Sequence, residues 1–87
     1  MKSLTSPEFW AAYRALSPEA RLSARKAYRL WQTNPHHGSL RFQKRGRYWR
    51  ACFGKGLRVL AVAIPDGYLW FWIGNHDEYE RLLKSAR

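Results

Sequence analysis

The first third of the chain has apolar residues at helical spacing, in two runs that begin with the same signal. Ser6-Pro7-Glu8 supplies a capping hydroxyl, a proline at the first helical position and a carboxylate near the positive end of the helix dipole. Ser17-Pro18-Glu19 repeats this signal, and Asn34-Pro35 ends the second run, because proline disfavours the α conformation in the residue before it. The pattern predicts two helices that form an antiparallel hairpin.

After residue 38 the apolar positions alternate, which is typical of strands. Leu40 and Phe42 alternate with polar residues, and residues 48–53 alternate again between glycine-containing turns at 45–47 and 54–56. Residues 57–64 are nearly all apolar, as in a central strand covered on both faces. Pro65-Asp66-Gly67 predicts a turn in which glycine supplies a positive φ, before a last strand over 68–73. The short turns predict a four-stranded antiparallel meander.

The last predicted strand is apolar on both faces. Simple alternation places Tyr68, Trp70 and Trp72 on one face and Leu69, Phe71 and Ile73 on the other. We expect one face to pack under the helices and the other to meet a C-terminal helix or to receive a segment of a partner protein.

A short C-terminal helix follows, with Asn75 as its cap and Glu78 at the capping-box position. The predicted fold class is therefore α+β: an N-terminal helical hairpin packed on a four-stranded antiparallel sheet with a short C-terminal helix. At 87 residues, the chain is expected to form a single domain over 1–87.

The composition supplies an aromatic core, with five Trp, five Tyr and four Phe. The only cysteine, Cys52, excludes an internal disulfide. No apolar run approaches the roughly 20 residues of a membrane span, and the N-terminus has no hydrophobic signal region. We expect a cytoplasmic protein.

Charge is distributed very unevenly in this chain, whose formal net charge is +10. Residues 20–65 contain eleven Lys or Arg and no Asp or Glu, and aromatic residues are interleaved with the densest part, 41–58. Clustered cations bind phosphate backbones, and aromatic rings among them stack on unpaired bases. Single-stranded RNA is the first ligand class that this pattern indicates; a generically solvated basic face is the alternative.

The order of these segments resembles the RelE/ParE superfamily of bacterial toxins. The resemblance covers nearly the whole chain and is carried by the helical hairpin, Asn34-Pro35, Ser39-Leu40-Arg41-Phe42-Gln43-Lys44, Tyr48-Trp49, Gly54, Leu57-Arg58-Val59-Leu60 and Trp72-Ile73-Gly74-Asn75-His76-Asp77-Glu78-Tyr79. Its most specific parts are the arginine in the third predicted strand and the ending of the form W-I-G-x-H-x-E-Y, which resembles one RelE-like subgroup.

This resemblance implies the toxin of a type II toxin–antitoxin system, neutralised by a cognate antitoxin. In the RelE branch, the toxin enters the ribosomal A site and cleaves mRNA without a cofactor; in the ParE branch, it poisons DNA gyrase. A catalytically degenerate module that binds RNA or antitoxin is a third possibility. Similarity of fold alone does not choose among them.

Cleavage of RNA by its own 2′-hydroxyl needs a base, an acid and positive groups around the phosphate, but no metal. The resemblance implies that Arg58 holds the phosphate, that His76 is the acid or base, and that Tyr79 stacks on a base or bonds a phosphate. It also suggests Arg50 as a cation on the second strand, whereas Cys52 stands where the family often has another basic residue. Arg58, His76 and Tyr79 favour the nuclease, and Cys52 favours the alternatives.

Each of these residues also has a structural explanation. Arg58 could form a salt bridge with Asp77 or Glu78, His76 could only cap or pack, and Tyr79 could anchor the last helix in the core. The predicted RNA-binding residues are Arg41, Lys44, Arg45, Arg47 and Lys55. His36-His37 does not indicate a metal site, because adjacent side chains in a loop rarely converge on one ion and no ligand set completes the site.

Overall fold

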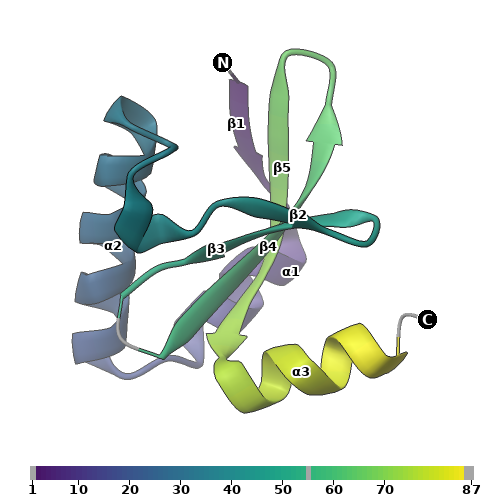
Figure 1. Ribbon diagram of the computed structural model, residues 1–87. Coiled ribbons are helices and arrows are strands. Elements are labelled where there is room, and N and C mark those ends of the chain that lie inside the picture. The colour runs from purple at the N-terminus through teal and green to yellow at the C-terminus, as the bar shows by residue number, and fades with distance from the viewer. Residues whose placement is uncertain (1, 55, 86–87) are drawn as a thin grey trace.

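The computed structural model describes residues 2–54 and 56–85 as a twisted sheet with three helices (Figure 1). The elements are β1 (Lys2–Thr5), α1 (Pro7–Arg14), α2 (Pro18–Thr33), the 3-10 turn η1 (Gly38–Leu40), β2 (Gln43–Arg45), β3 (Tyr48–Cys52), β4 (Leu57–Ile64), β5 (Gly67–Asn75) and α3 (His76–Ser85). The strand order is β1-β5-β4-β3-β2. None of the described helices has the length and hydropathy needed to cross a membrane.

The α+β class is confirmed, but the predicted four-stranded antiparallel sheet is wrong in one respect. The described sheet has five strands and is mixed, because β1 pairs in parallel with β5. Backbone hydrogen bonds hold β1 at both ends, from Lys2 N to Asp66 O at 2.6 Å and from Ser6 N to Trp70 O at 3.0 Å. This short, mostly exposed strand has no alternating pattern, so its pairing with β5 could not be seen in the sequence.

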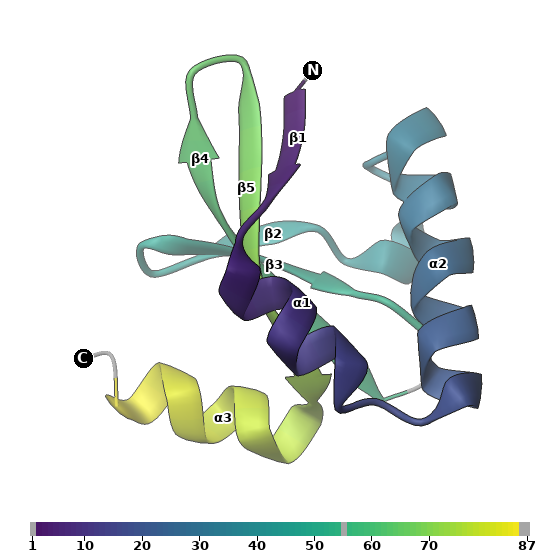
Figure 2. The same ribbon diagram turned by 180° about the vertical axis from the view of Figure 1, so that it is seen from behind.

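Both predicted helix starts are confirmed. The Ser6 hydroxyl accepts a hydrogen bond from Phe9 N, and the Ser17 hydroxyl accepts one from Ala20 N, each at 3.2 Å. The chain reverses direction between the helices as expected, but Figure 2 shows that α1 and α2 diverge from their turn instead of packing side by side. Both helices therefore contribute residues to the core on the same side of the sheet.

Trp31 of α2 lies at the centre of the core that these two helices form with the sheet. Its side chain is 1% exposed, and its indole makes edge-to-face contacts with Trp70, Phe42 and Tyr68 at centroid distances of 5.1, 5.6 and 6.0 Å. Such pairs add about 0.5 to 1.5 kcal/mol each beyond the burial of area. This cluster joins α2 to β5 and to the segment before β2.

A β-bulge divides the residues of β5 between the two faces of the sheet. Leu60 of β4 lies opposite Trp72, but the next residue, Ala61, lies opposite Trp70, so Phe71 is the extra residue. Trp70 packs in the core under the helices, whereas Trp72 shares the opposite face with Leu60. The prediction that Trp70 and Trp72 share a face is therefore wrong, because strict alternation does not include bulges.

Two turns also differ from the sequence-based expectation. The predicted first strand begins late: Arg41 has a left-handed φ of 46° after η1, and pairing starts only at Gln43. In the β4–β5 turn the positive φ belongs to Asp66, at 66°, and not to Gly67. Gly67 is needed for another reason, since a Cβ atom there would lie 2.6 Å from the carbonyl carbon of Lys2 and nearer still to its oxygen.

This close approach predicts that Gly67→Ala destabilises the protein, because β1 must move away from β5 to make room for the methyl group. We expect the free energy of unfolding to fall by about 1 to 3 kcal/mol in chemical denaturation. Gly38→Ala is the matched control, since a Cβ atom at Gly38 meets nothing within 4 Å. Equal stability of the two variants would contradict the pairing of β1 with β5.

Candidate functional site

The sheet surface turned away from α1 and α2 carries a second group of side chains, which we call the α3 face. On β3 and β4, side chains alternate, so Ala51 and Val59 enter the helix-side core while their neighbours point the other way. Residues directly opposite each other on paired strands share a face. The α3 face therefore consists of Arg50, Cys52, Arg58, Leu60, Trp72 and Gly74, in two rows across the sheet.

Arg50 is the most buried charged residue of this face, at 8% exposure. Its Nη2 atom donates to Gln43 Oε1 on β2 at 3.2 Å, but its buried Nε atom has no hydrogen-bond partner within the described residues. An unpaired donor on a buried cation is costly. An anion on this face would offset part of the cost of burying the charge.

Arg58 lies in the next row, directly opposite Cys52 on one side and Gly74 on the other. Its Nη1 atom donates to Leu57 O at 3.0 Å, and its buried Nε atom lacks a partner in the part of the chain that the structure describes. The salt bridge considered between Arg58 and Asp77 or Glu78 is not formed. Arg58 is thus a cation without a carboxylate partner among the described residues.

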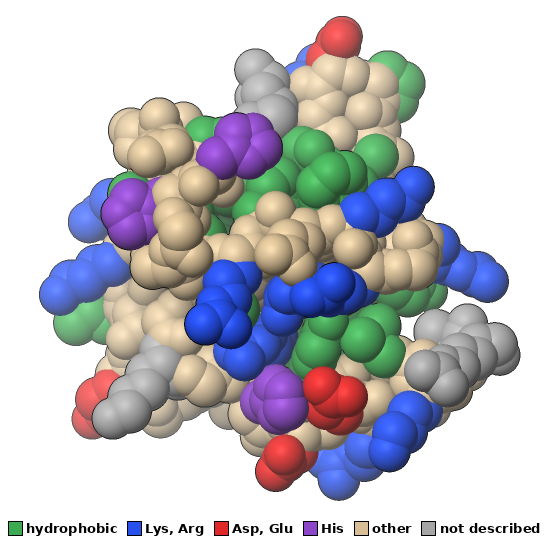
Figure 3. All heavy atoms as spheres, in the orientation of Figure 1, with side chains coloured by type: hydrophobic (Ala, Val, Ile, Leu, Met, Phe, Trp, Pro, Cys, Tyr) green, Lys and Arg blue, Asp and Glu red, His purple; other side chains and the backbone are tan. Residues whose placement is uncertain are grey.

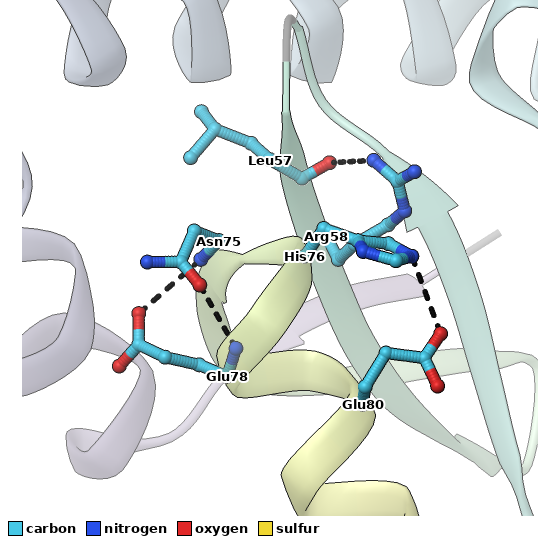
Figure 4. A network of polar contacts seen from close by, with 6 residues as sticks. All are labelled: Leu57, Arg58, Asn75, His76, Glu78 and Glu80. Carbon is cyan, nitrogen blue, oxygen red and sulfur yellow. Dashed lines mark hydrogen bonds and ion pairs between the residues drawn. The ribbon is translucent and has the colours of Figure 1, made fainter.

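The start of α3 brings His76 to the same end of β4 (Figure 4). The predicted capping box is present: Glu78 N donates to Asn75 Oδ1 at 2.8 Å, and Asn75 N donates to Glu78 Oε1 at 3.3 Å. This box fixes the direction in which α3 leaves the end of β5. The helix begins two residues after Gly74, which lies opposite Arg58. Because Glu78 is engaged in the cap, His76 interacts with a different carboxylate.

That carboxylate is Glu80, one helical turn further on. His76 Nε2 lies 3.2 Å from Glu80 Oε1, and both side chains are about half exposed, at 51% and 49%. An exposed pair of this kind contributes little to stability, and it exists as an ion pair only when the imidazole is protonated.

Tyr79 lies in the core, as in the structural explanation considered for it. It is 4% exposed, so most of its ring belongs to the buried surface between α3 and the sheet. Its centroid lies 6.2 Å from the His76 imidazole, next to the candidate acid or base. Tyr79 therefore anchors the helix that carries His76.

The predicted RNA-binding residues are not all on the α3 face. Arg45 lies opposite Tyr48 and borders this face, but Lys44 lies opposite Trp49 and points to the other side of the sheet. Arg41 and Arg47 are exposed at the two ends of β2, and Lys55 is outside the described residues. Figure 3 shows Lys and Arg side chains grouped across the middle of the molecule, over β2 and β3.

A groove of about 630 Å³ lies on the opposite side, where α1 and α2 diverge. Its walls include Phe9, Trp10, Tyr13, Arg25, Tyr28 and Trp70, so residues from both helices and the sheet form it. The apolar pattern of the sequence did not predict this groove. The one signal was Trp10, a helical tryptophan that remains 42% exposed.

The described residues contain no group of three or more His, Cys, Asp or Glu side chains placed to hold a metal ion. His37, one of the two adjacent histidines, instead pairs its Nδ1 with the Ser39 hydroxyl at 2.8 Å.

The arrangement of these elements matches solved toxin structures. The structure of a RelB–RelE antitoxin–toxin complex from Methanococcus jannaschii superposes with a TM-score of 0.66 at 13% identity, covering 91% of this chain and 96% of that one. The isolated E. coli RelE toxin superposes with a TM-score of 0.60 at 12% identity, covering 98% and 97%. The chain has the RelE fold. No family model matches the sequence, and no curated protein matches it either.

The RelE-like fold thus places Arg58 and His76 together through the cap of α3, and this cap can be tested by itself. Asn75→Ala removes the acceptor for Glu78 N, and we expect unfolding to become easier by about 0.5 to 2 kcal/mol. Asn75→Ser retains a capping oxygen and should stay near the wild-type value. The comparison is made by urea denaturation, and an alanine variant as stable as the wild type would show that the capping box does not hold α3.

Proposed function

We propose that this chain is the cytoplasmic toxin of a type II toxin–antitoxin pair and that it cleaves mRNA on the ribosome without a metal. The RelE-like fold over nearly the whole chain supports the toxin assignment. The observation that carries the nuclease assignment is the position of Arg58, free of any described carboxylate, beside the start of α3 where His76 lies. A phosphate would be held there within reach of an imidazole.

In the proposed reaction, the 2′-hydroxyl oxygen of one nucleotide attacks the adjacent phosphorus. The new O2′–P bond forms as the P–O5′ bond breaks, which leaves a cyclic phosphate and a 5′-hydroxyl. A base must take the 2′-hydroxyl proton, and an acid must give one to the departing 5′ oxygen. His76 is the residue of this site whose side chain ordinarily changes charge near neutral pH, so it can serve in either role.

Arg58 would stabilise the negative charge that develops on the phosphate oxygens. Its partner in this role is Arg50, because Cys52 brings no charge to the position opposite Arg58. Arg50 lies two residues from Cys52 on the same face and has an unsatisfied Nε–H. We propose that this arginine supplies the positive charge that Cys52 does not.

The same cations define the proposed antitoxin site. The M. jannaschii neighbour is a complex of RelE with its antitoxin RelB. We propose that the antitoxin of this chain covers the α3 face with an acidic segment, because carboxylates compete with phosphates for the same arginines. Neutralisation and loss of RNA binding would then have one cause.

Substitutions that remove the reacting groups should separate catalysis from folding. Arg58→Ala should lower the rate of mRNA cleavage on ribosomes by about a few hundred-fold. His76→Gln should lower it by roughly a hundred-fold or more. Cleavage is measured in a purified translation system, alongside the relief of growth arrest in cells.

Arg14→Ala and His36→Gln provide matched controls, since both residues are exposed and lie outside the α3 face. Thermal melts should be normal for all four variants, because none removes a residue of the hydrophobic core. Antitoxin binding should be normal for His76→Gln and for both controls, whereas Arg58→Ala removes one cation of the proposed antitoxin site and should weaken it. If folded Arg58→Ala and His76→Gln proteins arrest growth like the wild type, the nuclease proposal fails. Inhibition of DNA gyrase, measured by supercoiling, then becomes the leading hypothesis.

Binding of single-stranded RNA should depend steeply on salt. With about three phosphate contacts, the slope of log K against log salt concentration should be roughly −2. An excess of antitoxin should abolish this binding together with toxicity. Tight antitoxin binding that leaves RNA affinity unchanged would show that the acidic segment does not cover the α3 face.

A further inference from the structure

Trp72 differs from the other four tryptophans in its surroundings. Trp10, Trp31, Trp49 and Trp70 each lie against another aromatic ring, at centroid distances of 5.1, 5.1, 5.0 and 5.1 Å. Trp72 has no aromatic neighbour at such a distance among the described residues, and it is only partly buried. Its indole therefore takes no part in the aromatic packing that supports the core.

Gly74 allows this indole to lie close against the sheet. A Cβ atom at Gly74 would lie 2.6 Å from Cη2 of Trp72 and closer to Cζ2, so the six-membered part of the ring covers the glycine. No side chain other than hydrogen fits beneath it without displacing the ring. The bulge in β5 has the complementary effect, because it turns Trp72 to the α3 face while Trp70 remains in the core.

This position sets the ring next to Arg58. Gly74 lies directly opposite Arg58, and neighbouring strands are about 4.7 to 4.9 Å apart. The ring that covers Gly74 is therefore about one strand spacing from the backbone of Arg58. In the adjoining row, Trp72 and Arg50 lie on either side of Leu60.

We propose that Trp72 is the stacking platform for an unpaired nucleobase of RNA, the base adjacent to the phosphate held by Arg58. This inference rests on the proposed RNA substrate and deepens it by naming the residue that contacts a base. A partly exposed indole beside guanidinium groups that lack a carboxylate partner among the described residues matches a single-stranded nucleic acid, whose charged backbone and bases both need partners. Arg58 binds phosphate irrespective of sequence, so contact with the base depends on Trp72.

Two oligonucleotides of equal length and charge separate stacking from electrostatics. One is a short single-stranded RNA, and the other is its abasic counterpart, with the same phosphates and no bases. Wild-type protein should bind the complete RNA more tightly in a fluorescence anisotropy titration. Trp72→Leu should weaken binding to the complete RNA about five- to a hundred-fold, because one stacked base is lost, and should leave the abasic strand unaffected.

Three further variants test whether a loss of binding comes from lost stacking or from another effect of the substitution. Trp72→Phe keeps an aromatic face and should retain most of the preference for bases. Gly74→Ala keeps the indole but displaces it from the sheet, and it should lose part of the preference. Trp10→Leu removes an exposed tryptophan from the helix side and should bind both strands like the wild type. Thermal melts establish that each variant is folded.

Equal losses for the complete and abasic strands in Trp72→Leu, or no loss for either, would overturn the stacking role. A wild-type protein that binds both strands equally would overturn it as well. The nuclease proposal is judged separately by cleavage on ribosomes. A protein that prefers bases through Trp72 but never cleaves mRNA would refute the nuclease and retain the platform.

Discussion

The packing of Trp31 against one face of the sheet is the contact on which the rest of this fold depends. A chain of 87 residues buries a limited share of its surface, so one large side chain at the centre accounts for much of the core. Trp31 contacts rings from the segment before β2 and from β5, which holds these two parts of the chain to α2. Because the main apolar core lies on the helix side of the sheet, the opposite face, which α3 covers only in part, can carry charged side chains.

The bulge in β5, opposite Leu60 and Ala61 of β4, lets this one strand place a tryptophan on each face of the sheet. In a regular strand without the bulge, Trp70 and Trp72 would point to the same side, and one of them would be excluded from its present surroundings. With it, Trp70 completes the cluster around Trp31, and Trp72 joins Arg58 and Arg50 on the α3 face. Core packing and the candidate site are therefore built from consecutive parts of the same strand.

The charges of the α3 face are poorly compensated, which explains why a ligand is expected there. The ion pair found among the described residues joins His76 to Glu80, and neither Arg50 nor Arg58 has a carboxylate partner there. Two guanidinium Nε atoms are buried without acceptors. A folded protein tolerates such groups at a cost, and an anion on this face offsets part of that cost by neutralising the charge.

Local signals in the sequence determined most of the elements, because each signal acts within a few residues. They include the serine caps of α1 and α2, the Asn34-Pro35 pair that ends α2, the apolar run of β4 and the Asn75–Glu78 capping box. The candidate residues Arg58 and His76 were also identified there, through their positions in a familiar order of segments. Only the tertiary structure decided the parallel pairing of β1, the face occupied by Trp72 and the separation of Lys44 from Arg45. These features depend on register between strands distant in sequence, and a shift of one residue exchanges the two faces without changing any local pattern.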